Sequence, residues 1–310
     1  MDQTNAVGAR WSGLRALAGY GAALSMGLYL VVKVVWVIAA LFGHAPDDFG
    51  SADWILLNAT TVVMSGTGVA LGLALAQRWG LRLPAAPVLF FSWIGAGFLV
   101  PLIPFMLIGA FVGGDDGGDS TSAPSWETVF ITIGFAGMAV GLAVALPIYL
   151  RQRWPQAFLG RVGDLVRTGT TLPALGAGLL GVLWLYWAFG GTLGIAHREV
   201  DVTGRLLCAS SGMWALIGLA SACALATRRP VRLSLWIPMS LAFGASGSLF
   251  AWSAWKLPMT LLHPGGFTAV EYTPVAIVEH LLAITVGLTL MKVVLQTARR
   301  LGDEGRVDPG

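Results

Sequence analysis

The chain has 310 residues, of which 56% are hydrophobic and only 11% are charged, and its mean hydropathy is +0.74. Water-soluble domains carry about 25% charged residues, so this composition excludes a soluble globular protein. Apolar segments of roughly twenty residues are long enough to cross the ~30 Å hydrocarbon core of a bilayer. We therefore expect an all-α integral membrane protein.

Eight apolar segments follow one another along the chain, and each is expected to form a transmembrane helix. The first is longer than the apolar region of a typical signal peptide, so we interpret it as a true membrane span. Cys208 and Cys223 lie about four helical turns apart in one segment, so they cannot form a disulfide within one helix, and they are expected to be small buried core residues. The segments lie at about residues 20–42, 54–76, 86–112, 127–149, 171–194, 204–226, 233–254 and 270–296.

The charged residues are sorted between alternate turns. This sorting matches the positive-inside rule and predicts that both termini are cytoplasmic. The same rule, together with attraction to anionic lipid, accounts for the arginine clusters without a nucleic-acid partner. One set of turns and both tails carry Arg10, Arg15, Arg78, Arg82, Arg151, Arg153, Arg161, Arg167, Arg228, Arg229, Arg232, Arg299, Arg300 and Arg306. The opposite turns carry Asp47, Asp48, Asp53, Asp115, Asp116, Asp119, Glu199, Asp201 and Glu271.

The two halves of the chain align with each other, which indicates a tandem duplication. At an offset of 150 residues, the paired arginines Arg78 and Arg82 match Arg228 and Arg232, and Gly68 matches Gly218. At an offset of 151 residues, Trp36 matches Trp187. Four spans return the chain to its starting side, so the two repeats have the same orientation.

The predicted domains follow from this duplication. Residues 1–150 form the first four-helix repeat, and residues 171–297 form the second. Residues 151–170 carry apolar side chains on one helical face and basic ones elsewhere, which is typical of an amphipathic helix on the cytoplasmic surface; the alternative is a solvated loop. Residues 298–310 form a cytoplasmic tail.

A single lysine, Lys33, lies inside the first apolar segment, in LYLVVKVVWVIAAL (residues 28–41). It is about ten residues, or ~15 Å, from the outer end of its helix, and charges at such depth face the bundle interior and have a partner. Glu279 and His280 form a mid-span ionisable pair at nearly the same level of the last segment. We predict a polar site in the outer half of the membrane, in which Lys33, Glu279 and His280 bind a solute or carry a proton.

Aromatic residues belong to the same predicted site. Tyr29 and Trp36 share the helical face of Lys33 and can offer it a cation–π contact. The duplication aligns Lys33 with uncharged Trp184, so the site is expected to be asymmetric. The alternative is a structural ion pair between Lys33 and Glu279 that holds the first helix to the last.

Other patterns give weaker signals. Asp115-Asp116-x-x-Asp119 has the spacing of prenyl-diphosphate enzymes, but it lies among glycines and serines, so we expect a hydrated outer loop. His44, His197 and His263 are expected in outer loops without metal-ligand spacing, and we predict no metal site. No nucleotide-binding or catalytic-triad motif is present, and we predict no cofactor.

Helix-breaking residues occur at corresponding positions of the two halves. Pro101 and Pro104 lie in the third segment, and the run GASGS at 244–248 lies in the seventh. Interrupted helices in corresponding positions of two repeats are a feature of transport sites. The glycines of the other segments are interpreted as positions of close helix packing.

The stretches GYGAALSMGLYLVVKVVWVIAALFG and LLNATTVVMSGTGVALGLALAQRWGLRLPAAPVLFFSWIGAGFLVP, in an Ala-, Gly-, Val- and Arg-rich chain, resemble uncharacterised multi-pass membrane proteins of actinobacteria. The resemblance implies a bacterial plasma membrane and no established activity. Our leading expectation is a permease for a small solute or protons. The alternatives are a non-enzymatic membrane sensor with a cytoplasmic or membrane protein partner, and a membrane-embedded enzyme acting on a lipid or isoprenoid.

Overall fold

The computed structural model describes residues 3–44, 52–99, 101–103, 105, 126–155, 160–165, 172–196, 201–264 and 267–307. Within these residues the protein is helical, and the backbone also forms two isolated β-bridges. Five helices are long and apolar enough to cross a membrane: α1 (Gln3–Leu41), α2 (Ala52–Ala76), α5 (Trp126–Arg153), α7 (Val202–Thr227) and α9 (Thr273–Val307). Shorter apolar helices are α3 (Ala85–Leu99) and α6 (Leu172–Ala188), and α8 (Trp236–Leu262) completes the α-helices of the described residues.

The chain is thus an all-helical multi-pass membrane protein, which confirms the class predicted from composition. Each of the eight predicted segments contains an α-helix in the described part of the chain. Apolar segments in lipid fold as helices because every backbone N–H and C=O must find its partner inside the segment. The number of membrane crossings, the tandem repeat and the cytoplasmic termini stay predictions.

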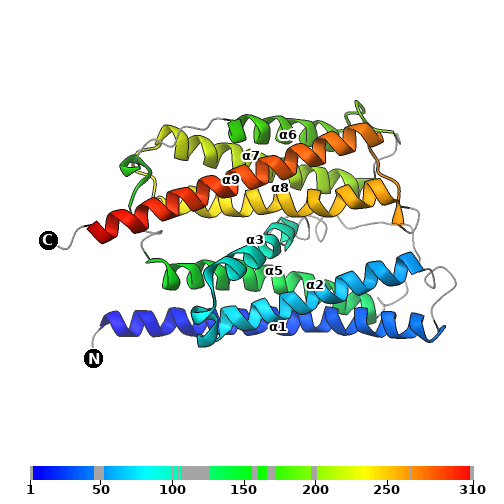
Figure 1. Cartoon of the computed structure of the whole chain (residues 1–310), viewed down its shortest axis with the longest axis horizontal. Helices are drawn as coiled ribbons and strands as arrows, with labels where there is room; N and C mark the ends of the chain where they lie inside the picture. The colour runs from blue at the N-terminus through cyan, green and yellow to red at the C-terminus, as the bar shows by residue number, and fades with distance from the viewer. Residues whose placement is uncertain are drawn as a thin grey trace. The chain divides into compact units, whose positions relative to one another are not determined.

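The helices belong to two compact units, each with its own packing (Figure 1). Unit 1 comprises Met1–Gly95, Leu102–Tyr149 and Leu262–Phe267. Unit 2 comprises Ala96–Pro101, Leu150–Leu261 and Thr268–Gly310. Unit 1 therefore contains α1, α2 and α5 up to Tyr149, and unit 2 contains α6, α7, α9 and all but the last residue of α8. Helix α3 is divided between the two units after Gly95.

Glycines let the helices of unit 1 pack closely. Gly72 of α2 lies against the backbone of Ala23 in α1, where a methyl group would clash. On α5, Gly141 lies against Ala22 of α1 in the same way. Small residues at such crossings allow close backbone approach, which is how membrane helices gain packing contacts. Gly66 differs from this pattern, because no atom of another residue lies near the position of its missing side chain.

Helix α1 begins at Gln3, well before the predicted start of the first span. Arg15, which the charge sorting assigned to the cytoplasmic tail, lies inside this helix and is buried. Its Nη1 donates a 2.7 Å hydrogen bond to the carbonyl of Leu75 in the last turn of α2, where carbonyls lack partners within the helix. Tyr149 completes this end of unit 1, because its hydroxyl donates to the Gly80 carbonyl at 2.8 Å.

The core of unit 2 forms where its four helices meet. Gly218 of α7 faces Ala177 of α6, Ala245 of α8 and Leu290 of α9. Gly287 of α9 lies against the α8 backbone. These contacts hold the helices of unit 2 side by side, as the ribbon shows for α6, α7, α8 and α9 (Figure 1).

Helix α8 is continuous through the GASGS run, so the expectation of an interrupted helix at 244–248 is wrong. All five residues of this run are buried. The physical reason is packing: the backbone of Gly247 lies against Gly97 near the end of α3, and a side chain at Gly97 would clash with it. Pro101 follows the end of α3, and Pro104 lies outside the described residues.

The predicted linker at 151–170 is described only in part. Its first residues end α5 at Arg153, and a short 3₁₀ helix follows at Val162–Asp164. Arg161 forms an isolated antiparallel bridge with Ser234. Residues 156–159 and 166–171 lie outside the described residues, and the surface amphipathic helix stays a prediction.

Candidate functional site

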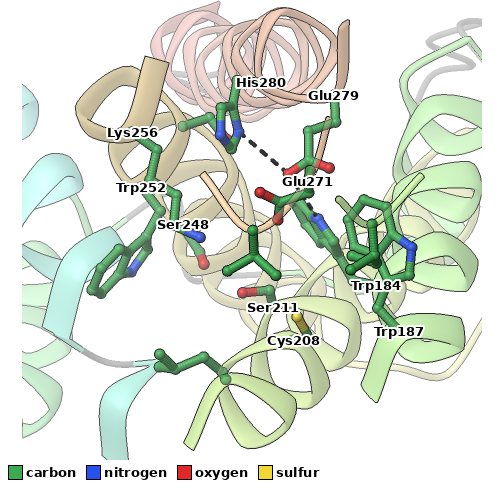
Figure 2. A pocket seen from close by; sticks show the side chains of 15 residues that line it. Trp184, Trp187, Cys208, Ser211, Ser248, Trp252, Lys256, Glu271, Glu279 and His280 are labelled. Atoms are coloured by element: carbon green, nitrogen blue, oxygen red, sulfur yellow. Dashed lines mark hydrogen bonds and ion pairs between the residues drawn. The ribbon is translucent and has the colours of Figure 1, made fainter. Parts of the chain in front are cut away.

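Unit 2 contains a cavity of about 170 Å³ at the end where α6 and α8 finish and α7 and α9 begin (Figure 2). Within each helix, the residues that line the cavity lie on one helical face, since side chains three or four positions apart lie on the same side of a helix. Helix α6 contributes Trp184 and Trp187, and helix α7 contributes Cys208 and Ser211. The cavity therefore arises from the packing of all four helices.

Glu279 of α9 is the most buried acid in this wall, with 4% of its surface exposed. Its Oε1 accepts a 3.3 Å hydrogen bond from the indole Nε1 of Trp184. Its Oε2 is buried and has no hydrogen-bond partner among the described residues. One oxygen of the carboxylate is thus fixed by α6, and the other is left without a donor.

His280 lies beside this carboxylate and is 3% exposed. Its Nδ1 is 3.4 Å from Glu279 Oε1, the contact drawn as a dashed line in Figure 2. The geometry of this contact is not that of a hydrogen bond, and Nδ1 has no hydrogen-bond partner within the described part of the chain. A neutral imidazole has one donor and one acceptor nitrogen, so Nδ1 retains capacity to bond a ligand.

Trp187 and Tyr186 of α6 hold the loop that follows this helix. Trp187 Nε1 donates a 2.8 Å hydrogen bond to the carbonyl of Leu193. The hydroxyl of Tyr186 accepts from the backbone N–H groups of Thr192 and Leu193, at 3.2 and 3.3 Å. These bonds fix the loop against the end of α6, so this part of the wall is held in place by side chains of the helix.

A second loop segment brings Glu271 to the cavity. Ile195 and Glu271 form an isolated antiparallel bridge. The bridge is formed by two 2.9 Å backbone hydrogen bonds, one from Ala196 N to Val270 O and one from Tyr272 N to Gly194 O. Glu271 is half-buried and lines the cavity directly before α9 begins.

Lys256 of α8 also lines the cavity, and this lysine is exposed. Lys256 was not among the predicted site residues because the seventh predicted span ends at residue 254, whereas α8 continues to Leu262. The signal was present in the four-residue spacing of Ser248, Trp252 and Lys256, which places all three on one helical face. The charged residues of the lining therefore range from Lys256, which is exposed, to Glu279, which is buried.

Lys33 is found in unit 1, where its contacts are with neutral groups. Its Nζ donates a 3.0 Å hydrogen bond to Asn58 Oδ1 on α2. It lies 4.1 Å from the ring centre of Trp36 and 5.5 Å from that of Tyr29, in agreement with the helical spacing. Asn58 is buried and donates its Nδ2 to the Trp54 carbonyl at 3.0 Å, which orients the amide toward the lysine.

The predicted site residues thus form two groups. Trp184, Glu279 and His280 meet in unit 2, and the structure adds Lys256, Glu271 and three lining serines to them. Lys33, Tyr29 and Trp36 meet in unit 1. A pairing of Lys33 with Glu279 would join the two units, and it stays a prediction.

The remaining candidate residues do not form a site within the described part of the chain. Asp115, Asp116, Asp119 and His197 lie outside the described residues. His44 and His263 are exposed, and within the described ranges no group of three His, Cys, Asp or Glu side chains is placed to hold a metal ion. Both cysteines are free, but Cys208 is half-buried and Cys223 is exposed, so the expectation that both are buried core residues is wrong. No protein-family model, curated protein or solved structure matches this chain.

Proposed function

We propose that the protein is a small-solute permease of a bacterial plasma membrane and that the cavity of unit 2 is its solute site. The observation that supports this is the unpartnered Oε2 of buried Glu279 at the cavity wall. Leaving a buried acceptor unsatisfied costs about 1–3 kcal/mol, and more for a charged group. A solute that donates a hydrogen bond to this oxygen recovers that free energy.

The cavity volume limits the size of the solute. About 170 Å³ equals the liquid volume of roughly five or six water molecules at ~30 Å³ each. Pockets for drug-sized ligands measure about 300–1,000 Å³. The space therefore suits a small polar molecule and is too small for a lipid tail or an isoprenoid chain, which argues against the membrane-enzyme alternative.

The position of the cavity suggests the side of entry. It lies beside Glu271 and the loop that carries Ile195, in turns that the charge sorting assigns to the outer face. The exposed Lys256 lies at the rim of the cavity, and the buried Glu279 lies at its inner wall. In this proposal a solute enters from outside and meets Lys256 before Glu279.

The second candidate is a membrane sensor that binds the same solute without moving it. It is favoured by the loop contacts of the wall, since Tyr186 and Trp187 both fix the loop after α6 by hydrogen bonds. A wall held in one position suits binding and signalling. Transport instead requires an alternating opening of the site, so a measurement of solute flux separates the two candidates.

The test is permeation into proteoliposomes that contain the full chain. The probes are four small solutes of different charge: ethylene glycol, glycine, glycolate and ethanolammonium. Ser211→Leu fills the cavity, and Thr285→Leu is the matched control because Thr285 lies on the exposed side of α9. Swelling followed by light scattering reports entry of each solute, and binding is measured separately by calorimetry.

We expect at least one probe to enter faster than in empty liposomes, with Thr285→Leu equal to wild type and Ser211→Leu equal to empty liposomes. Binding that Ser211→Leu abolishes, without any flux in the wild type, would establish the sensor instead. If all four probes neither bind nor permeate, or if Ser211→Leu behaves like wild type, the cavity is not a solute site.

A further inference from the structure

Resting on the proposed solute site, we infer that its ligand carries a small primary or secondary ammonium group, which binds between Glu279 and His280. The observations that define this chemistry are the hydrogen-bonding state of the two side chains, the charges of the lining and its aromatic content.

The carboxylate of Glu279 requires a donor. Its Oε1 already accepts the Trp184 N–H, and its buried Oε2 is the acceptor that the described residues leave unpaired. A ligand carboxylate or phosphate offers only acceptors and would place like charges together. A quaternary ammonium carries the right charge but has no N–H to donate. An ammonium with N–H groups meets both requirements.

His280 supplies a second acceptor for the same group. Its Nδ1 lacks a hydrogen-bond partner in the described residues and is only 3.4 Å from Glu279 Oε1, so both side chains can reach one ligand atom. A neutral imidazole with its proton on Nε2 accepts at Nδ1. Two acceptors call for two N–H bonds, which a primary or secondary ammonium provides.

The charges that line the cavity favour a cation. The lining contains two carboxylates, Glu271 and Glu279, and one ammonium, Lys256. With Glu279 ionised and His280 neutral, the lining has an excess of one negative charge. Lys256 is exposed, whereas Glu279 is buried in the inner part of the wall. The inner part of the cavity is therefore complementary to a single positive charge.

The remaining wall suits a short organic chain. Trp184, Trp187 and Trp252 line the cavity, and indole is the aromatic group that attracts cations most strongly. Ser211 and Ser248 add hydroxyl groups to the lining of the same cavity (Figure 2). A small amine with a short alkyl or hydroxyalkyl chain fits these surfaces and the cavity volume.

The experiment is calorimetric titration of the full chain in phosphatidylcholine nanodiscs. Ethanolammonium is the probe, and three molecules of similar size test each part of the inference. Ethylene glycol replaces the ammonium by a neutral hydroxyl, glycolate replaces it by an anion, and tetramethylammonium keeps the charge without N–H. We expect ethanolammonium to bind at least about 10-fold more tightly than each of the three.

Glu279→Gln keeps the shape of the side chain and removes its charge. Hydrogen bonds to charged groups contribute about 1.5–3 kcal/mol, so we expect a loss of about 10- to 100-fold in ethanolammonium affinity. Glu127→Gln is the matched control, because Glu127 lies on α5 of unit 1 and away from the cavity lining. If Glu279→Gln fails to fold, the comparison of the four probes on the wild type still tests the ammonium class.

The outcomes separate this inference from the proposed function. If ethylene glycol, glycolate or tetramethylammonium binds as tightly as ethanolammonium and Ser211→Leu abolishes that binding, the ammonium class is wrong and the solute site stands. If no probe binds, both are wrong. Ammonium groups also occur on phosphatidylethanolamine, so the titration is repeated in discs with this lipid. Competition there identifies the headgroup as the occupant, and its absence identifies a free amine.

Discussion

The contact between Lys33 and Asn58 allows the sharpest test of the structure. The two side chains come from α1 and α2 of unit 1, with Nζ 3.0 Å from Oδ1. Interhelical hydrogen bonds in membrane proteins average about 0.6 kcal/mol and reach ~1.7 kcal/mol in double-mutant cycles. A charged donor strengthens the bond, so we expect a coupling free energy of about 1–1.7 kcal/mol between Lys33→Met and Asn58→Leu.

Each single variant should leave the other side chain partly supported. In Asn58→Leu, the ammonium of Lys33 keeps its contacts with the rings of Trp36 and Tyr29. In Lys33→Met, Asn58 keeps its bond to the Trp54 carbonyl. We therefore expect each single change to lower the free energy of unfolding by about 1–2 kcal/mol, and the double variant to lose less than the sum.

The assay is equilibrium unfolding in mixed micelles of increasing denaturing detergent, followed by tryptophan fluorescence. Thr60→Val replaces Asn58→Leu in a control cycle, because the Thr60 hydroxyl bonds only within α2, to the Leu56 carbonyl. A coupling below about 0.3 kcal/mol between Lys33 and Asn58 would refute the assigned contact. A larger coupling of Lys33→Met with Glu279→Gln would instead establish the partner predicted from sequence.

Four further changes test packing and hydrogen bonds by the same unfolding measurement. Gly141→Ala should cost about 1–3 kcal/mol, because a Cβ there lies 2.6 Å from a side chain of α1. Gly66→Ala, with nothing within 4 Å of the added atom, should instead gain up to about 1 kcal/mol. Tyr149→Phe should cost about 0.5–1.5 kcal/mol through its lost bond to the turn after α2, and exposed Tyr20→Phe should be neutral. Trp187→Phe should cost about 1 kcal/mol and speed proteolysis of the loop after α6, with unchanged proteolysis contradicting the anchoring role.

Hydropathy predicted the helices because in lipid an apolar segment has no alternative to internal hydrogen bonding. It did not predict where helices continue beyond the apolar core. Helix α1 begins at Gln3, and α8 carries its helical face past residue 254 to Lys256. At these ends the residues are more polar, and the helix is determined by packing and backbone bonds that a hydropathy pattern does not contain.

Depth counting had a comparable limit at the candidate site. It identified Lys33, Glu279 and His280 as the unusual groups, since ionisable side chains in apolar segments are costly without a functional or structural partner. Depth fixes a level along the helix axis but not a direction around it. The hydrogen-bond acceptor of Lys33 is Asn58 on the next helix, with Nζ 3.0 Å from Oδ1, and because this acceptor is neutral no pattern of opposite charges indicates it.

The predicted duplication relates the two polar groups to each other. Lys33 aligns with Trp184, and Asn58 aligns with Cys208. In each unit, the aligned residue donates an N–H hydrogen bond to a neighbouring helix. Lys33 of α1 donates to Asn58 on α2, and Trp184 of α6 donates to Glu279 on α9.

The difference lies in the acceptor. Cys208 has the place of the asparagine on α7 and lines the cavity, and a thiol is a weak acceptor. The indole N–H of unit 2 is therefore bonded by the carboxylate of α9, and the second oxygen of that carboxylate is left open to the cavity. Under the predicted duplication, three differences between aligned positions distinguish the satisfied contact of unit 1 from the unfilled acceptor of unit 2: Trp184 in the place of Lys33, Cys208 in the place of Asn58 and, at an offset of 146 residues, Glu279 in the place of Ile133.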